Sequence, residues 1–348
     1  MKNLNWIILS VLVLISNLVT AQIPEIKKKN CYDKGTSNSG KRFAEWECGK
    51  LAGVVDCNEK LTYDEDSKLV LSGNMGMPFS GTCETCHMNG LLERRVTFVS
   101  GKEHGVDTTY YKSGCPQVVR NHFQGEENGQ WVFYFDSTQA IAWEMNYSYG
   151  QQHGKQIWLT RTGDTSRIEF YNNGLLHGTK KLYYSKSRIE KEINYVNGLM
   201  EGVFKHYTIE GILLDEINYK QGKKHGECKY YYDDGTLLKT EHWNMDVKDG
   251  EFKTFYYQGY VQTMENFKKG IPEGWFEERW PDDKLKRRAF YKKGEMIEEY
   301  KYDEQGTETY AFGGPPGGGT SEDHIPGKKT KKRKKGKEQE KGGLIKIE

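Results

Sequence analysis

The string Cys-x-x-Cys-His carries the most specific chemistry in this sequence. It is formed by Cys83, Cys86 and His87, in the spacing that attaches c-type haem through two thioethers and an axial imidazole. On a regular strand, residues three apart leave opposite faces of a sheet, whereas haem attachment needs both thiols on one side. We therefore keep a haem or redox site as an alternative and expect these residues to occupy ordinary strand positions.

The remaining cysteines predict disulfides rather than catalysis. The chain has 7 cysteines, and Cys31, Cys48 and Cys57 precede all the others. In an oxidising compartment we expect one or two disulfides, with pairing among these three favoured, which would tie the N-terminal segment to the first structural unit. The spacing does not determine the connectivity, and buried unpaired thiols are the alternative.

Four histidines recur just before a repeated glycine and invite a metal interpretation. Structural units of two strands lie ~9.6 Å apart, too far for two imidazoles to sit ~2 Å from one ion. We find no nucleophile elbow, phosphate-binding loop or paired-carboxylate motif in the sequence, and so predict no catalytic residues, no metal and no cofactor. The histidines are His104, His153, His177 and His225.

Composition indicates the elements that must carry these residues. The 348 residues include 39 Gly, 23 Tyr and only 8 Pro, with 13% aromatic and 36% hydrophobic residues and a formal net charge of +2. Many Gly and Tyr with few aliphatic residues favour short strands joined by tight turns over helix bundles or a doubly wound sheet. The aromatic content is too high for a disordered chain.

A glycine recurs every 24 residues, with one interval of 25. We number the positions of each unit by their offset from this glycine, and two further glycine series follow at offsets of about 9 and 20. Such recurrence is typical of a repeat architecture. The first series is Gly81, Gly105, Gly129, Gly154, Gly178, Gly202, Gly226, Gly250 and Gly274.

Each unit predicts one β-hairpin. Two apolar runs flank a dipeptide such as Asn89-Gly90 or Asp234-Gly235, and Asn-Gly or Asp-Gly supplies the positive φ values of a two-residue hairpin turn. The third glycine series then marks the turn into the next hairpin. With this turn, positions pair when their offsets sum to about 17, counted from the geometry of a two-residue loop.

This register places an aromatic residue opposite the glycine, where the ring would shield bare backbone. A Tyr series at offset 5 should face the other side of the sheet, and an aliphatic series at offset 11 the glycine's side. The aromatic series is Phe98, Tyr171, Tyr195, Tyr219, Trp243, Phe267 and Tyr291, with His122 and Asn146 as exceptions and Tyr147 displaced by the insertion. We predict an all-β, elongated, solenoid-like array of hairpins in a single twisted antiparallel sheet.

The ends differ from the array. Residues 1–21 predict a signal peptide, so we expect an exported protein of the periplasm, cell envelope or extracellular space, with no transmembrane span in the mature chain. Residues 22–56 would form a Cys-containing cap, 57–312 the array, with Leu61 to Gly81 as a degenerate first unit, and 313–348 a disordered Gly/Pro and Lys-rich tail. The basic stretch from Lys328 to Lys337 favours attraction to an anionic surface, lipid or polysaccharide, and no specific nucleic acid is predicted.

The pattern (H/E)-G-x4-Y-Y-x2-G-x-L-x5-Y-x2-G, from about Gly81 to Lys293, resembles the MORN-repeat variant family of Gly- and Tyr-rich hairpin repeats. The resemblance implies a hairpin array acting as a protein-binding or lipid-proximal scaffold, and similar bacterial proteins are often labelled antitoxin components. We therefore expect a non-enzymatic scaffold for an unknown protein partner. An antitoxin- or immunity-type protein that binds a toxin is the second alternative.

Overall fold

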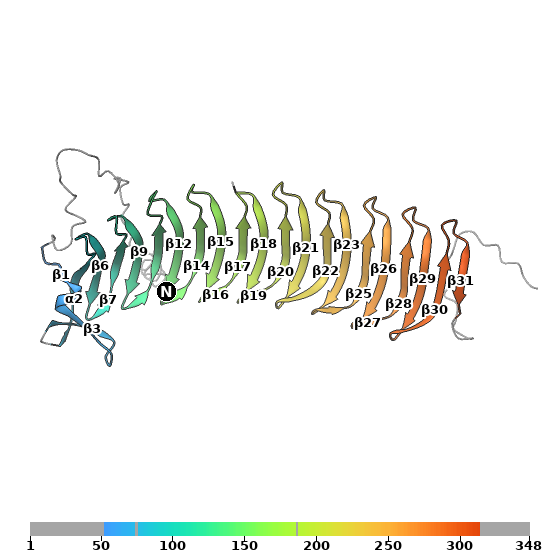
Figure 1. The fold of residues 1–348 in the computed structure, drawn as a ribbon. Helices are drawn as coiled ribbons and strands as arrows, with labels where there is room; N and C mark the ends of the chain where they lie inside the picture. Colours follow the sequence, from blue (N-terminus) through green and yellow to red (C-terminus); the bar gives the residue numbers. More distant parts are fainter. Residues whose placement is uncertain (1–51, 74–75, 186, 314–348) are drawn as a thin grey trace, which may run out of the picture.

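The computed structural model describes residues 52–73, 76–185 and 187–313. Nearly all of them belong to one open sheet of 28 strands, almost entirely antiparallel, whose strands run across the long axis of the molecule (Figure 1). The predicted all-β hairpin array is confirmed. The predicted signal peptide, Cys31, Cys48 and the basic tail lie outside the described residues.

Each repeat unit is a hairpin of two long strands. In chain order these are β5 (Gly81–Cys86) with β6 (Leu92–Val99), β8 (Gly105–Tyr110) with β9 (Pro116–Phe123), β11 (Gly129–Tyr134) with β12 (Ile141–Ser148), β14 (Gly154–Leu159) with β15 (Thr165–Asn172), β17 (Gly178–Tyr183) with β18 (Ile189–Val196), β20 (Gly202–Tyr207) with β21 (Leu213–Lys220), β22 (Lys223–Tyr231) with β23 (Leu237–Asn244), β25 (Gly250–Phe255) with β26 (Val261–Lys268), β28 (Gly274–Arg279) with β29 (Leu285–Lys292), and β30 (Glu295–Tyr302) with β31 (Glu308–Phe312).

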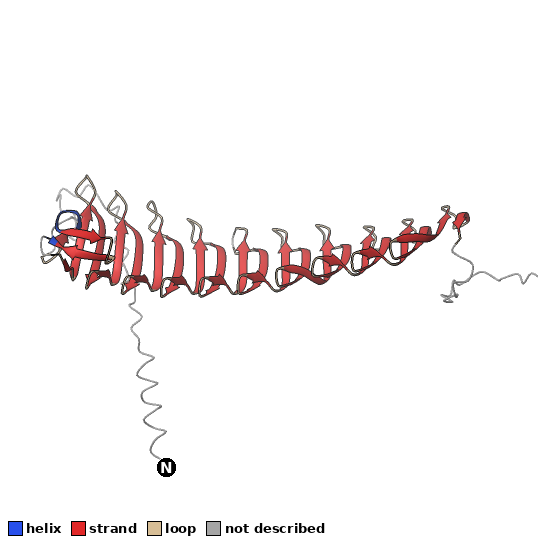
Figure 2. Cartoon of the chain, turned by 90° about the horizontal axis from the view of Figure 1, so that it is seen from below, coloured by secondary structure: helices blue, strands red, loops and turns tan. Residues whose placement is uncertain are grey.

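Short two-residue arms lead into most of these hairpins. They are β7 (Lys102–Glu103), β10 (Glu126–Glu127), β13 (Gln151–Gln152), β16 (Leu175–Leu176), β19 (Leu199–Met200), β24 (Val247–Lys248) and β27 (Ile271–Pro272). Seen from below, the whole sheet bends and twists along its length (Figure 2), as expected from the right-handed twist of its strands.

The predicted register holds for most of each hairpin. Gly202 pairs with Tyr219, and the offsets continue to sum to 17 as far as offset 4. The register then shifts by one residue, so that Tyr207 at offset 5 pairs with Leu213 at offset 11. Partners in a pair share a face, so the aliphatic series lies beside the Tyr series and not, as predicted, on the glycine's side.

The two-residue turn does not lie within the hairpins, where it was predicted. In the loop within a hairpin only the glycine has positive φ, as at Gly90 (78°), and its N–H donates to the carbonyl of His87 (2.9 Å). This is a type I turn followed by a glycine bulge. The two-residue turn with two positive φ values occurs instead between hairpins, as at Asn173 (48°) and Gly174 (78°).

The glycine at offset 0 is required by its backbone more than by the ring across from it. Gly154 has a φ of 76°, and a methyl group added there would meet no atom within 4 Å. The residue lies where the pairing of Tyr147 with Gln152 gives way to that of Trp143 with Trp158, which leaves extra residues on one strand. Positive φ at such a bulge favours glycine, so shielding by the aromatic ring is not its main cause.

The N-terminal end has an architecture of its own. The described segment before the first hairpin contains the single helix α2 (Cys57–Lys60), the strand β1 (Val55–Asp56), which pairs in parallel with β5, and a separate sheet of β2 (Leu61–Asp64), β3 (Leu69–Ser72) and β4 (Met77–Pro78). Leu61 to Gly81 is therefore not a leading unit of the main sheet. Its Phe79 carbonyl accepts from Gly101 N–H (2.7 Å), which is the bond that each later turn makes to the unit before it.

Candidate interaction surface

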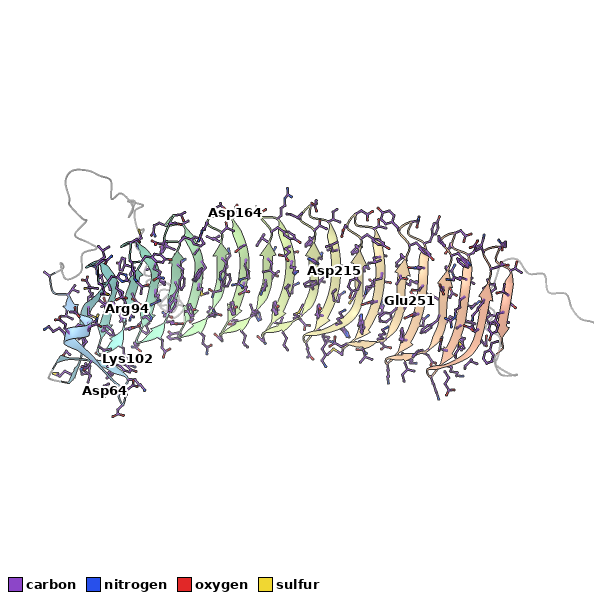
Figure 3. All side chains as sticks on the ribbon, in the orientation of Figure 1. Asp64, Arg94, Lys102, Asp164, Asp215 and Glu251 are labelled. Carbon is purple, nitrogen blue, oxygen red and sulfur yellow. A yellow bond between two sulfur atoms is a disulfide. The ribbon has the colours of Figure 1, made fainter. Side chains whose placement is uncertain are left out.

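The two faces of the sheet differ in chemistry. In the hairpin β20–β21, Gly202, Phe204 and their partners Tyr219 and Ile217 lie on one face, which we name the glycine face. Lys205, Glu216 and the Tyr series lie on the other, the tyrosine face. Arg94 and Asp215, both of the glycine face, are labelled at mid-height of the sheet in Figure 3.

An unbroken series of rings, the aromatic column, runs along the glycine face of the last three full units. It comprises Trp243, Phe252, Phe267, Phe276 and Tyr291, with centroid distances between neighbours of 5.3, 5.3, 5.4 and 4.6 Å. Only Phe252 is buried (7% exposed); the other four rings are half-buried. The column is therefore both a packing device for a single-layer sheet and a surface that a partner can reach.

Lysines cover parts of this column. The Lys248 ammonium lies 4.7 and 4.3 Å from the centroids of Phe252 and Phe267, and that of Lys224 lies 5.2 Å from Trp243. Cations over aromatic faces are attracted by the ring quadrupole. The chain's own cations therefore occupy faces of Trp243, Phe252 and Phe267.

Glu241 anchors the start of the column. Its carboxylate accepts from Lys239 (2.7 Å), Trp243 Nε1 (2.9 Å) and the Tyr230 hydroxyl (3.0 Å). Burial opposes its ionisation, but these hydrogen bonds hold the pKa of Glu241 below its usual value. Burial and the neighbouring Glu241 charge raise the pKa of Tyr230 well above its usual range, so the hydroxyl stays a donor at physiological pH.

Three other clusters on the glycine face repeat this arrangement of one carboxylate between two cations. In all four the carboxylate side chain is 1–13% exposed and the cations 21–49%. Each buried carboxylate thus holds two cations at the surface. The clusters are Asp107 with Arg94 and Arg120, Glu169 with Arg167 and Lys180, Glu241 with Lys224 and Lys239, and Glu299 with Arg287 and Lys301.

The first cluster also brings together Glu103, Asp107 and His122, with one possible ligand atom from each within 4.8 Å of the others. Arg94 already bonds Glu103 (2.5 Å) and Asp107 (2.9 Å), and Arg120 bonds Asp107 (3.1 Å). Two guanidinium charges stand where a cation would approach, so the donor set fits an ion-pair network better than a metal site. Burial lowers the pKa of His122, which keeps its ring neutral.

The Cys-x-x-Cys-His string does not form a haem attachment site. Cys83 is bonded to Cys57 in a disulfide, Cys86 is also disulfide-bonded, and His87 Nε2 lies 3.0 Å from the Tyr110 carbonyl oxygen. Both thiols are therefore engaged. The disulfide confirms that Cys57 is bonded and joins the N-terminal segment to the first hairpin, but its partner lies in the array and not among the first three cysteines.

The other predicted repeat positions are found in their units. The glycines and aromatic residues pair across each hairpin as expected, including Gly129 with the displaced Tyr147. The insertion falls in the third hairpin loop, where Gln139 takes the positive φ (54°) of the missing glycine. The repeated histidines are held one per unit; His104 packs its ring 5.4 Å from Phe123.

Sequence reasoning missed an asparagine ladder on the tyrosine face. An Asn at offset 16 donates its side-chain amide to the carbonyl at offset 1 of the next unit. The signal was present as an Asn placed directly before the aromatic residue of the glycine face. The bonds join Asn121 to Gln130 (2.8 Å), Asn146 to Lys155 (2.5 Å), Asn194 to Val203 (2.7 Å), Asn218 to Glu227 (2.5 Å) and Asn266 to Trp275 (2.7 Å).

Comparison with known proteins adds no assignment. No family model matches the chain, and no curated protein matches it. Similar solved structures include that of TcdB2-TccC3-Cdc42 (11% identity, TM-score 0.15, 70% of this chain and 18% of the other), that of TcdB2-TccC3 (11%, 0.14, 68% and 18%) and the Photorhabdus luminescens Tc holotoxin pore (10%, 0.14, 72% and 19%). The chain thus spans less than a fifth of these structures, and such low scores carry no argument about function.

Among the described residues no helix is long and apolar enough to cross a membrane.

Proposed function

We propose that this chain is a non-enzymatic scaffold whose glycine face binds a protein partner. The observation that carries the proposal is the aromatic column, Trp243 to Tyr291, lying half-buried on an open sheet. Antiparallel sheets commonly pack one face against other protein while the second faces water. The aromatic face here has no second layer over it among the described residues of the last three units, so a partner would complete the packing.

The cations beside the column indicate the chemistry of that partner. The side chains of Lys248 and Lys239 are 40% and 36% exposed. Each therefore carries its charge at the surface while it contacts a ring or a carboxylate. A protein segment with apolar side chains flanked by carboxylates matches this pattern, since aromatic residues and charge complementarity drive protein recognition.

A single charge reversal tests the proposal. Lys248→Glu places a negative charge over Phe252 and Phe267, whereas Lys253→Glu makes the same change on the tyrosine face of the same hairpin. Affinity purification of the tagged protein after cross-linking should recover a specific partner with the wild type and with Lys253→Glu, and at least about tenfold less with Lys248→Glu. Equal recovery by all three proteins, or nothing above an untagged control, contradicts the proposal.

Export remains part of the proposed function. The Cys57–Cys83 bond and the disulfide-bonded state of Cys86 and Cys115 support it, because disulfides persist in oxidising compartments. Mass spectrometry of the protein from its native host should show a mature chain lacking the predicted signal peptide and oxidised at Cys57. An uncleaved, reduced cytoplasmic chain would instead favour the antitoxin-type alternative.

A further inference from the structure

The array has two rims of different charge in its C-terminal half. The loops within hairpins form one edge, the loop rim, and the two-residue turns between hairpins form the opposite edge, the turn rim (Figure 1). Asp164 on the loop rim and Lys102 beside a turn are labelled in Figure 3. The rims differ from the two faces described above because they are defined by the ends of the strands and the residues that connect them.

The turn rim carries two exposed lysines at three of its last four turns, and at one of them the exposed Glu295 pairs directly across the strands with Lys292. Its six lysines are exposed, and within the described residues none of their ammonium groups forms an ion pair. Lys220 even pairs directly across the strands with Lys223, a like-charge arrangement that is unfavourable without an outside counter-charge. The lysines are Lys220 and Lys223, Lys268 and Lys269, and Lys292 and Lys293.

The loop rim is acidic over the same length. Asp233 and Glu304 are exposed, and no hydrogen bond or ion pair engages either side-chain carboxylate within the described residues. The loop between them in the chain, 280–284, is partly neutralised, since Asp282 pairs with Lys284 (2.7 Å) and Asp283 with Arg279 (3.3 Å). The acidic residues are Asp233 and Asp234, Asp282 and Asp283, and Asp303 and Glu304.

Along the array, the kinds of side chain on successive loops complement those on successive turns. From the hairpin β20–β21 to the end, the loops read apolar with Glu210, acidic, aromatic, acidic and acidic. The turns that precede the same hairpins read apolar, basic, apolar with Asp246, basic and basic. The apolar members are exposed: Ile209 (43%), Tyr257 (59%) and Tyr260 (49%) on the loop rim, and Val196 (44%), Leu199 (52%) and Val247 (43%) on the turn rim.

We propose that the loop rim of one copy docks on the turn rim of a second copy, displaced along the array by half a repeat so that each loop faces the turn that precedes its own hairpin. Both rims repeat at the same spacing of ~9.6 Å because both follow the strands of one sheet. In this alignment Asp233 faces the Lys220 turn, Tyr257 the Val247 turn and Glu304 the Lys292 turn. Displaced by half a repeat in the opposite direction, Asp233 would face Asp246 at the turn after its own hairpin, a like-charge contact.

A translation is the operation that relates the copies. Two identical arrays bent in the same way remain parallel under translation, so the bend seen in Figure 2 does not separate the rims, and the contact extends over the units whose strands share nearly one direction. Each copy keeps a free rim, and such a heterologous contact continues to further copies instead of closing as a dimer. The product is a side-by-side raft of arrays that leaves the glycine face and its column open, so this inference goes beyond the proposed function and does not depend on it.

The contacts are surface ion pairs, so association should be weak and strongly salt-dependent, since charges are screened over ~8 Å at physiological ionic strength. Sedimentation velocity of the full chain at low ionic strength should give a mass that rises with concentration above that of a monomer. High salt should return the chain to a monomer.

Paired charge reversals identify the surface. The first variant carries Lys220→Glu with Lys292→Glu, and the second Asp233→Lys with Glu304→Lys. All four side chains are free of hydrogen bonds in the described structure, so circular dichroism and thermal melting should match the wild type. Each variant alone should associate at least about tenfold more weakly, and an equimolar mixture should regain association because opposite charges then meet at both rims.

Three results would overturn the inference. They are a monomeric wild type at low ionic strength, association that neither variant weakens, and a mixture that fails to recover. Association unaffected by both variants would point to another surface of the chain. Partner binding through Lys248 can survive any of these outcomes, which keeps the two proposals distinguishable.

Discussion

At offset 2 the second hairpin holds Asp107 and the ninth holds Phe276, although both lie on the glycine face and pair with offset 15. Asp107 lies beside Arg94, Arg120 and His122, whereas Phe276 lies beside rings of the aromatic column. One backbone thus supports a buried ionic network at one end and an open aromatic surface at the other. The turns, the bulges and the asparagine ladder fix the backbone of each hairpin. The residue types at offsets 2 and 15, in the middle of the glycine face, can therefore differ between units.

The largest difference between the two ends should appear when offset 2 is truncated. Asp107→Ala removes a buried carboxylate, which leaves Arg120 without its ion pair and Arg94 with Glu103 alone, and it should cost about 3 kcal/mol in the free energy of unfolding. Phe276→Ala removes a half-buried ring and should cost about 1–2 kcal/mol. Chemical denaturation measures both, and hydrogen exchange of β8 and β28 locates the loss. An equal or smaller cost for Asp107→Ala would show that its ion pairs are not structural.

The next effect comes from the disulfide that joins the N-terminal segment to the array. Replacing Cys57 and Cys83 together by serine opens a loop spanning 26 residues and should lower the free energy of unfolding by about 2–4 kcal/mol. Cys228, at the same offset in the seventh hairpin, is a buried free thiol, and Cys228→Ala should cost about 1 kcal/mol. Thermal melting of the oxidised proteins distinguishes the two variants. An equal loss of stability in both would show that the disulfide adds nothing to the stability of the N-terminal end.

The asparagine ladder offers a smaller and internally matched comparison. Asn121 is 6% exposed and Asn266 is half-buried, yet both donate to the next unit's carbonyl at 2.8 and 2.7 Å. We expect Asn121→Ala to cost about 1–2 kcal/mol and Asn266→Ala about 0.5–1 kcal/mol, because water can replace the lost partner only at the exposed site. Urea denaturation tests this order, and the reverse order would contradict the difference in burial.

The smallest predicted effect is a pH dependence confined to the first cluster. Burial lowers the folded-state pKa of His122 below its ordinary 6.5, so the unfolded chain takes up a proton first as the pH falls. Stability should therefore be complete above pH ~6.5 and decrease as the pH falls toward the folded pKa. The charged groups that face the imidazole also act on this pKa: Glu103 and Asp107 raise it, and Arg94 and Arg120 lower it.

His122→Phe, which restores the ring found at this position in other units, should flatten the melting temperature between neutral and mildly acidic pH. Tyr291→Phe, at the same offset in the ninth hairpin, should leave the pH profile as it is in the wild type. A wild-type profile that His122→Phe does not change would assign the titration to another group.

The sequence allowed the fold to be predicted because its period is local. Gly154 and Tyr171 recur at fixed spacing, and a hairpin register follows directly from that spacing. The turn type was misassigned because Asn89-Gly90 is equally compatible with a two-residue turn and with a type I turn plus bulge. What separates them is the extra residue at offset 12, whose effect depends on the pairing of both strands.

The site was less predictable because burial and partners are set across units. Asp107 and Arg120 pair within one hairpin, as the predicted register implies, but Arg94 comes from the unit before, through the pairing of β6 with β8. Cys57 meets Cys83 because a parallel strand pair, β1 with β5, returns the chain to the first hairpin. Such a short parallel pairing leaves no periodic signal in the sequence.

The orientation of the strands has a mechanical consequence. Because the strands lie across the long axis, their hydrogen bonds lie along it, and tension applied between the two ends opens one ladder at a time. Under load the chain should therefore lengthen stepwise at low force, peeling from β31 toward the Cys57–Cys83 bond. The scaffold would then behave as an extensible tether with a covalent stop near its N-terminal end.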